Sequence, residues 1–290
     1  MSPARAWLVV ALLAGVAVPA AAGWAGPAQP VRFAPERDYG PFVFQREDGR
    51  IDGLSVEMLA ALQQRAGLTV TTLPARPLSE QLEALRRREA DLVSSLRATP
   101  ERGEYALFTL PYVSVPAVVV MRADRPERHL AAMQGQAVAV GKGYAVEAVM
   151  RQRYPQVAWQ GVSDDGVALI GVLQRRFEAA VVDAASFAHV AATQRLQGLR
   201  MVAPADFEYT LSFAIRKDWP ELHGALDDAI RAMPRAQRQA ILRRWIAEPP
   251  RPDRTPWATW LGVSLLALGA LTVLVASGRG LRGRRTPRGD

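Results

Sequence analysis

Residues 90–112 read ADLVSSLRATPERGEYALFTLPY, a stretch that joins a strand signal to a polar loop containing an arginine. Leu92 and Val93 open the strand, and the loop from Ser94 to Arg102 follows it. Upstream of this stretch, strand and helix signals alternate. We predict strands at 31–33 and 68–73, a helix capped by Ser55 that ends before Gly67, and a helix capped by Ser79 with Leu82 and Leu85 facing inward. This order predicts a parallel sheet covered by helices on both faces.

A second α/β unit follows the apolar run PAVVVM at 116–121. We predict strands at 137–140 and 179–182, and helices at 145–154 and from Asp164-Asp165, the latter with Val167, Ile170 and Leu173 facing inward. The run LSFAI at 211–215 returns the chain to the first unit, where one helix begins with Pro220 and another ends at Trp245.

Two units joined by two crossing segments predict a cleft that can open and shut. Ligands of open α/β sheets lie beyond the carboxyl ends of the strands, and clefts between domains are favoured pockets. The candidate site therefore comprises the loops at 39–42, 94–102 and 141–144 and the segment around Asp183.

The two ends of the chain are apolar in different ways. Residues 7–22 follow Arg5 and close on three alanines, which is the pattern of a secretory signal peptide over 1–22. Residues 257–276 carry no charge and are long enough to cross a bilayer, and five arginines follow in the tail at 277–290. A proline-rich stalk at 249–256 precedes them. We therefore expect one C-terminal transmembrane helix in the inner membrane, a periplasmic domain and a cytoplasmic C-terminus; a signal peptide that stays attached would add a second anchor.

Charge and composition exclude several classes of function. The formal charge is +8, but the tail accounts for +4 and Arg5 for +1, which leaves about +3 for the exported part. This balance argues against nucleic-acid binding. The chain has no cysteine, and its three histidines, His129, His189 and His223, are isolated in the sequence. We therefore expect no disulfide, no metal site and no cofactor.

Four stretches resemble the family 3 periplasmic solute-binding proteins, the amino-acid-binding type with a Venus-flytrap fold. They are YGPFVF from Tyr39, GLSVEML from Gly53, the run at 90–112, and FAIRKDWPEL at 213–222 leading to Arg244-Trp245. The resemblance covers about 31–248 and points to the versions built into membrane-anchored bacterial sensors. It implies an α/β, two-lobed fold with two crossing segments, with one lobe at about 31–121 and 210–248 and the other at about 122–209.

The resemblance also implies a binding site. In the family's Thr-x-x-Arg element, which reads Thr99-Pro-Glu-Arg102 here, the arginine holds the α-carboxylate of the ligand, and a guanidinium can do so with two parallel hydrogen bonds. Asp183 stands where the family binds the α-ammonium group, and Tyr39 where an aromatic ring packs on the ligand. The residues alone favour other roles: a surface ion pair for Arg102, a helix cap for Asp183 and a loop wall for Tyr39.

The chain departs from the family pattern at two places that bear on the ligand. Arg97 follows Ser95 where the family often has serine or threonine. An Arg97 side chain that points into the cleft would favour a doubly anionic ligand; one that points outward would be a solvated charge. Tyr144 replaces the threonine of a Gly-Thr element, and we expect it to narrow the cleft or to stack on the ligand.

We therefore expect a membrane-anchored solute-binding or sensing protein that closes on a small carboxylate ligand, an amino acid or a dicarboxylate. Its partner would be a separate sensor kinase or a transporter in the inner membrane. The alternative is a periplasmic enzyme that resembles dehydratases of cyclic precursors of aromatic amino acids. Asp183, Glu147 or Glu178 would then be the general acid. The sequence contains no Ser/His/Asp arrangement, so we assign no catalytic residue.

Overall fold

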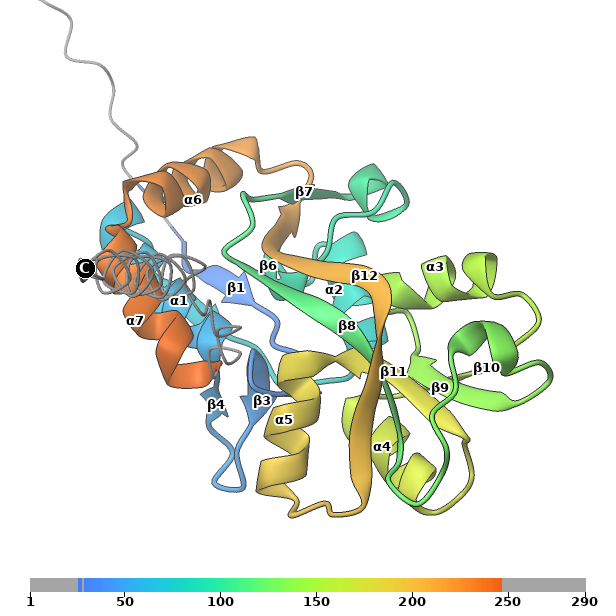
Figure 1. Ribbon diagram of the computed structural model, residues 1–290. Coiled ribbons are helices and arrows are strands. Elements are labelled where there is room, and N and C mark those ends of the chain that lie inside the picture. Colours follow the sequence, from blue (N-terminus) through green and yellow to red (C-terminus); the bar gives the residue numbers. More distant parts are fainter. Residues whose placement is uncertain (1–25, 28, 247–290) are drawn as a thin grey trace, which may run out of the picture. The chain divides into compact units, whose positions relative to one another are not determined.

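The structure is a computed structural model that describes residues 26, 27 and 29–246 (Figure 1). The predicted signal peptide, stalk, transmembrane helix and tail lie outside the described residues. Among the residues that are described, none forms a helix of the length and apolarity that a membrane crossing requires.

The first lobe is built on strands in the order β5-β1-β6-β12. The strands β1 (Val31–Phe33), β5 (Val70–Thr72) and β6 (Leu92–Leu96) are parallel, whereas β12 (Leu199–Arg216) runs antiparallel to β6 and to β7 (Ala106–Phe108). The predicted parallel sheet is therefore mixed, because the returning strand enters from the opposite direction. A short second sheet carries β2 (Asp38–Tyr39), β3 (Val43–Gln45) and β4 (Ile51–Asp52).

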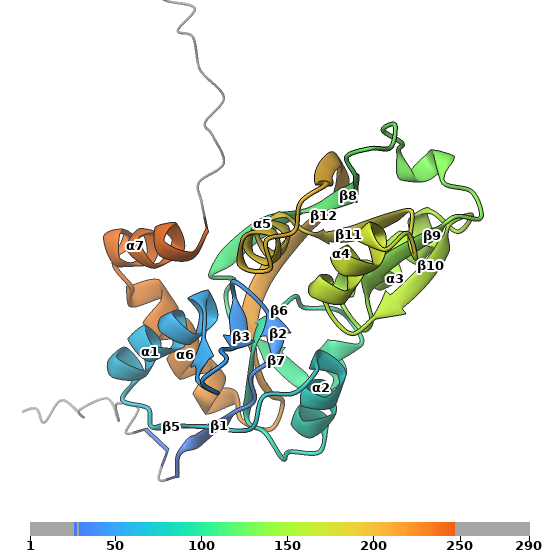
Figure 2. The ribbon, with the colours of Figure 1, turned by 90° about the horizontal axis from the view of Figure 1, so that it is seen from below.

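Four helices cover the first lobe: α1 (Leu54–Ala66), α2 (Leu78–Arg86), α6 (Pro220–Ala232) and α7 (Arg235–Trp245). Figure 2 shows α1, α6 and α7 grouped together and α2 apart from them. The predicted capping roles of Ser55 and Ser79 are wrong. Both helices begin one residue before these serines, and Ser55 is instead buried, where its hydroxyl pairs with that of Tyr112 at 2.7 Å. Gly67 ends α1 with φ 61°, the left-handed conformation that glycine adopts most readily.

The second lobe carries the strands β9 (Ala137–Gly141), β10 (Ala158–Val162) and β11 (Ala179–Asp183) and the helices α3 (Ala145–Arg153), α4 (Asp165–Leu173) and α5 (Ala184–Thr193). The inward face predicted for α4 is wrong. Ala168, Leu169 and Val172 are buried, whereas Val167 is 37% exposed. The helix therefore buries a face shifted from the predicted one, which contains Asp165, Ala168, Leu169 and Val172.

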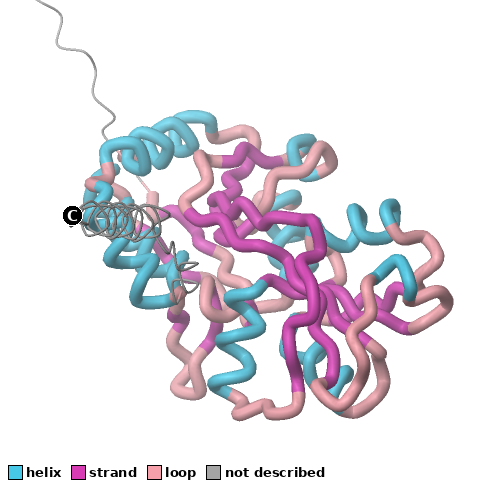
Figure 3. Tube along the Cα trace, viewed as in Figure 1, coloured by secondary structure: helices cyan, strands magenta, loops and turns pink. Residues whose placement is uncertain are grey.

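Two crossing strands join the lobes, β8 (Val113–Arg122) and the long β12. They pair antiparallel from Leu199 opposite Arg122 to Leu211 opposite Val113, with irregular register around Ala203 and between Pro204 and Glu208. Figure 3 shows these strands running through the middle of the described chain with helices on its outer sides. Two short 3₁₀ turns complete the fold, one at Arg102–Glu104 and one at Leu130–Ala132. Two extended segments of this kind are the natural place for a hinge.

Candidate ligand-binding site

The lobes meet around a crevice of about 20 Å³. It is lined by residues of both lobes and of the crossing strand, among them Glu36, Tyr39, Arg102, Tyr144 and Tyr209. A cavity of this size holds about one water molecule. A larger groove of about 750 Å³ opens beside it, between the β2–β3 region and the helices α4 and α5. In this conformation, an amino acid can enter the crevice only if the lobes separate or these side chains turn aside.

Arg102 bridges the lobes from the first lobe. It is the first residue of the 3₁₀ turn, and its backbone N–H donates to Thr99 Oγ1 at 3.2 Å. The guanidinium is 5% exposed and donates to the Arg97 carbonyl at 2.7 Å and, across the junction, to the Gly143 carbonyl at 2.8 Å. Among the described residues, no carboxylate forms an ion pair with Arg102. Burial lowers the pKa of Arg102 from its usual value. A buried cation without an anionic partner is suited to receive an anion.

Tyr144 bridges the lobes from the second lobe. Its hydroxyl donates to Glu36 Oε1 at 2.6 Å, and its ring lies 5.5 Å from that of Tyr39. Glu36 is 2% exposed, and burial raises the pKa of its carboxyl to about 8. Tyr144 is one of the residues that line the crevice. A third bridge runs from Ser186 Oγ to the Gly40 carbonyl at 2.8 Å.

Two aspartates at the starts of neighbouring helices form a buried pair in the second lobe. Asp183 ends β11 and caps α5, because its Oδ1 accepts the Ser186 N–H at 2.7 Å. Burial raises the pKa of Asp183 to about 6. Asp165 is the first residue of α4, and burial together with the charge of Asp183 raises its pKa well above the usual value. Within the described part of the chain, Asp183 Oδ2 and both oxygens of Asp165 lack a hydrogen-bond partner.

Of the predicted site residues, five line the crevice: Tyr39, Ser95, Arg97, Arg102 and Tyr144. Asp183 is not among the lining residues but lies within electrostatic range of Tyr39. Ser95 adopts φ 62°, its hydroxyl donates to Ser55 Oγ at 2.8 Å and its N–H donates to the Tyr112 hydroxyl at 2.8 Å, so it is held inside the first lobe.

Arg97 lies at the edge of the crevice. Its guanidinium sits 4.5 Å above the Phe207 ring and also donates to the Glu208 carbonyl, both on β12. The Arg97 guanidinium therefore interacts with the crossing strand β12.

Sequence reasoning missed Glu36, Asp165 and Tyr209. Glu36 lies three residues after the end of β1, so a loop counted from the end of that strand includes it. Asp165 is recognisable in the sequence only as the start of a helix, and Tyr209 stands inside a strand, where nothing local distinguishes it from a core residue. The other two acids named as alternatives for a general acid form ion pairs. Glu147 pairs with Arg151 on helix α3, and Glu178, just before β11, pairs with Arg125.

Comparisons with known proteins agree with this architecture. The family model of bacterial extracellular solute-binding proteins, family 3, matches residues 31–248. The virulence sensor protein BvgS of Bordetella pertussis is 27% identical over 241 residues, which are 82% of this chain and 19% of BvgS. The sensor protein EvgS of Escherichia coli K12 is 21% identical over 72% of this chain and 18% of EvgS. The chain thus spans less than a fifth of these sensors. The L-cystine-binding protein TcyJ of Escherichia coli K12 is 25% identical over 72% of this chain and 80% of its own length.

Solved structures show the same fold. A histidine kinase sensor domain similar to periplasmic binding proteins superposes with a TM-score of 0.71 at 23% identity, over 76% of this chain and 98% of that domain. The periplasmic VFT2 domain of Bordetella pertussis BvgS superposes with a TM-score of 0.67 at 26% identity, over 74% of this chain and 92% of that domain.

Proposed function

The chain belongs to the bacterial extracellular solute-binding proteins of family 3, and we propose that its lobes close on a small carboxylate ligand, an amino acid. One observation carries this proposal. Arg102 is buried at the junction of the lobes, and its donors reach across to the second lobe without meeting a carboxylate in the described chain. The carboxylate of a ligand placed there would accept two parallel hydrogen bonds from the guanidinium.

The second half of an amino acid would meet the aspartate pair. An α-ammonium group placed between the lobes can donate to Asp183 Oδ2, an oxygen that lacks a hydrogen-bond partner in the described chain. A ligand that binds both lobes makes contacts in the closed state that the open state does not offer, and it therefore shifts the population toward closure. The hinge of this motion would be the paired strands β8 and β12.

We further propose that the protein acts at the outer face of the inner membrane, anchored by the predicted helix at 257–276, and that its partner there is a separate sensor kinase or a transporter. Phe44 supports a route from the crevice toward the anchor. Its ring lies 4.9 Å from that of His189 in the second lobe and 6.1 Å from that of Trp245. Trp245 is the last residue of α7 and precedes the predicted stalk. A movement of His189 therefore changes the packing around the residue that leads out of the domain.

Thermal unfolding of the purified full-length chain tests the proposed binding. We expect at least one L-amino acid to raise the unfolding temperature by a few degrees at saturating concentration, because a ligand that binds only the folded state stabilises it by mass action. A panel of all proteinogenic amino acids, glutarate and succinate that produces no shift would contradict binding as the function.

A dehydratase on the same fold is the second candidate, and one observation favours it. Asp183 is buried and its pKa is raised to about 6, which is the property of a general acid that works near neutral pH. Incubation with prephenate or arogenate, followed by the absorbance of the aromatic product, separates the two functions. Turnover that is lost in Asp183→Asn would favour the enzyme, and absence of turnover favours the binding protein.

A further inference from the structure

More carboxyl groups lie around the crevice than the single ammonium group of a neutral amino acid requires. Arg102 and Glu36 line the crevice, and Asp165 and Asp183 lie within electrostatic range of its residues Glu36 and Tyr209. Each of these four residues, three acids and one guanidinium, is at most 5% exposed. Beyond the effect of burial, the charges of Asp183 and Glu36 both raise the pKa of Asp165, and the charge of Arg102 lowers the pKa of Glu36. A zwitterionic amino acid with a neutral side chain supplies one positive and one negative charge. Its carboxylate can pair with Arg102 and its ammonium group with one of the two aspartates. The remaining carboxyl groups are then left without a partner on the ligand.

Several oxygen atoms of these carboxyl groups lack a hydrogen-bond partner among the described residues. Glu36 Oε2, both oxygens of Asp165 and Asp183 Oδ2 are buried and lack a hydrogen-bond partner in the described chain. Oxygen atoms in such positions lose their hydration on closure and gain nothing in exchange. Glu36 comes from the first lobe and the two aspartates from the second, so a donor group between the lobes can reach oxygens on both sides.

Aromatic faces complete the surroundings. Tyr39, Tyr144 and Tyr209 line the crevice, and the Tyr209 hydroxyl also lacks a partner in the described chain. Tyrosine rings attract cations to their faces, and ring and carboxylate together are the usual environment of a bound ammonium or guanidinium group. A dicarboxylate would bring a second negative charge near Asp165 and Asp183, and an ionised member of this pair would repel it in a dry site.

We propose that the ligand is an amino acid with a cationic side chain, an amino or guanidino acid such as lysine, ornithine or arginine, whose second positive charge is received by Glu36 and Asp165. This inference rests on the proposed function and narrows its ligand class. It replaces the doubly anionic ligand that Arg97 suggested, because Arg97 is held on β12. The ligand takes the place of the Tyr144–Glu36 and Arg102–Gly143 hydrogen bonds as the link between the lobes.

Isothermal titration of the full-length chain with matched ligands tests the proposal. Lysine and norleucine differ only in the terminal amino group, and glutamate reverses the charge. We expect lysine or arginine to bind at least tenfold more tightly than norleucine, and glutamate to bind more weakly than either. Norleucine or glutamate binding as tightly as lysine would overturn this inference and leave the proposed function standing. Absence of binding by every amino acid would overturn both.

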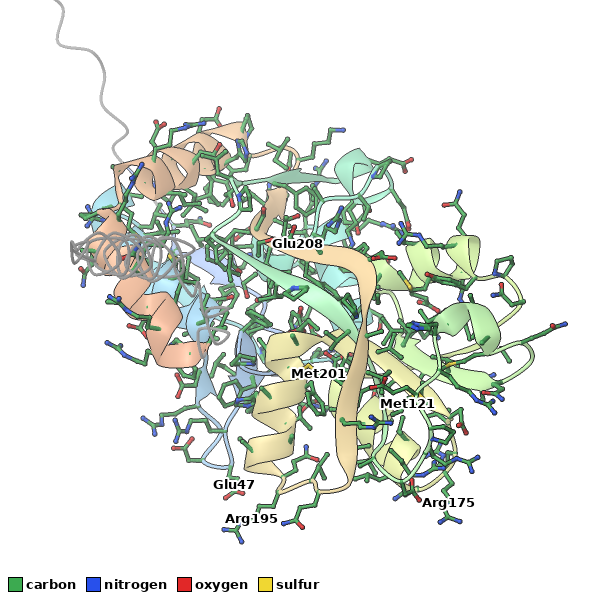
Figure 4. All side chains as sticks on the ribbon, in the orientation of Figure 1. Glu47, Met121, Arg175, Arg195, Met201 and Glu208 are labelled. Atoms are coloured by element: carbon green, nitrogen blue, oxygen red, sulfur yellow. The ribbon has the colours of Figure 1, made fainter. Side chains whose placement is uncertain are left out.

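Two variants locate the second charge. Asp165→Asn and Glu36→Gln are each expected to reduce the preference for lysine over norleucine, the ratio of their dissociation constants, by about tenfold. Glu208→Gln is the control, because Glu208 is an exposed acid on the crossing part of β12, next in sequence to Tyr209 (Figure 4). A preference for lysine that both crevice variants retain in full would overturn the assignment.

Proton release gives a readout that does not depend on a variant folding. Glu36 carries a proton in the closed crevice, and an arriving ammonium group stabilises its ionised form. Lysine binding near neutral pH is then expected to release close to one proton to the buffer, measured as the dependence of binding heat on the ionisation heat of the buffer. Norleucine should release much less. Equal proton release for both ligands would contradict the role given to Glu36.

Discussion

At the scale of single residues, the site depends on charges that are buried before any ligand is considered. The Arg102 guanidinium donates hydrogen bonds to two backbone carbonyls, and the Glu36 carboxyl accepts a hydrogen bond from the Tyr144 hydroxyl. The partners of Arg102 are neutral, so they compensate its buried charge only partly. The residues of the crevice are therefore arranged for a charged molecule at a cost to the stability of the empty fold.

Removal of Arg102 is the most direct residue-scale prediction. Arg102→Ala should weaken the binding of the cognate amino acid by at least tenfold, because truncating one member of a buried charge pair costs about 2–5 kcal/mol. Arg102→Lys should recover only part of the loss, since an ammonium group cannot form two parallel bonds to a carboxylate. Titration calorimetry measures both. Arg87→Ala, an exposed change on the same lobe, is the control, and a loss below tenfold in Arg102→Ala would place the ligand elsewhere.

The Glu36 carboxyl predicts a pH dependence of stability. Its pKa is raised from 4.5 to about 8, mainly by burial, although the Tyr144 hydroxyl lowers it, Asp164 and Asp38 raise it and Arg102 lowers it. The folded chain therefore keeps this proton at pH values where the unfolded chain has released it. The stabilising contribution is complete below about pH 4.5 and is lost as the pH rises to about 8.

The unfolding free energy should accordingly fall between about pH 6 and pH 8. We take pH 6 as the lower limit because it is the pKa of Asp183, the other buried acid with a raised value near neutral pH. The slope contributed by one proton is at most about 1.4 kcal/mol per pH unit. Urea unfolding at several pH values measures it, and Glu36→Gln should reduce the slope whereas Glu208→Gln should not. An unchanged slope in Glu36→Gln would show that Glu36 ionises in the fold as it does in water.

At the scale of elements, helix starts deliver the acids to the crevice. The strand β11 ends at Asp183, the helix α5 begins beside it, and Asp165 occupies the first position of α4. Carboxylates are favoured at helix N-termini by the helix dipole and by free N–H groups. The same residues can therefore stabilise a helix and face a ligand, and the two interpretations of Asp183 as a cap and as a ligand group are compatible.

Substitutions at Asp183 separate these two roles. Asp183→Ala should lower the unfolding free energy by about 1 kcal/mol through loss of the cap. Asp183→Asn should keep the cap and be at least as stable as the parent near neutral pH, because it removes a buried charge. Asp164 is the matched control, since it caps α4 through Val167 N at 2.8 Å from an exposed position. Equal destabilisation by Asp183→Asn and Asp183→Ala in urea unfolding would contradict the separation.

At the scale of the whole domain, closure depends on a few direct contacts between the lobes. Besides the three hydrogen-bonded bridges, the Gly40 backbone lies directly against the His189 ring. A Cβ atom at Gly40 would lie 2.4 Å from that ring, closer than real contacts allow. The Phe44 ring also packs on His189, with the ring centroids 4.9 Å apart, and limits the room of the imidazole to move. Gly40 thus permits the close approach of the two lobes.

Gly40→Ala should therefore hold the lobes apart. We expect a larger radius of gyration in solution scattering and a weaker response to the ligand. Gly40→Ala combined with His189→Ala should restore the compact form, because the second change removes the ring that the methyl group meets. The control is Gly103→Ala, where an added Cβ meets no atom within 4 Å. A Gly40→Ala chain with unchanged dimensions and affinity would show that closure does not depend on this contact.

The local sequence determined the order of the elements. Apolar runs at 116–121 and 179–182, Pro220 at the start of α6 and Gly67 at the end of α1 are short-range signals, and the helices and strands follow them. The helix caps failed as predictions where tertiary contacts overrode local preference. Ser55 satisfies its hydroxyl on Tyr112, 57 residues away in the chain, and so it is not available as a cap.

Only the tertiary structure decided the composition of the crevice. Glu36 meets Tyr144 from 108 residues away, and Ser186 meets Gly40 from 146. Such encounters depend on how far two lobes approach each other, which no local periodicity encodes. The resemblance to a family directed attention to Arg102 and Asp183, and the fold brought them together with acids that have no local signature. Charge balance across the junction is a property of the packed lobes, and for that reason the sequence predicted a cleft but not the charge of the molecule that fits it.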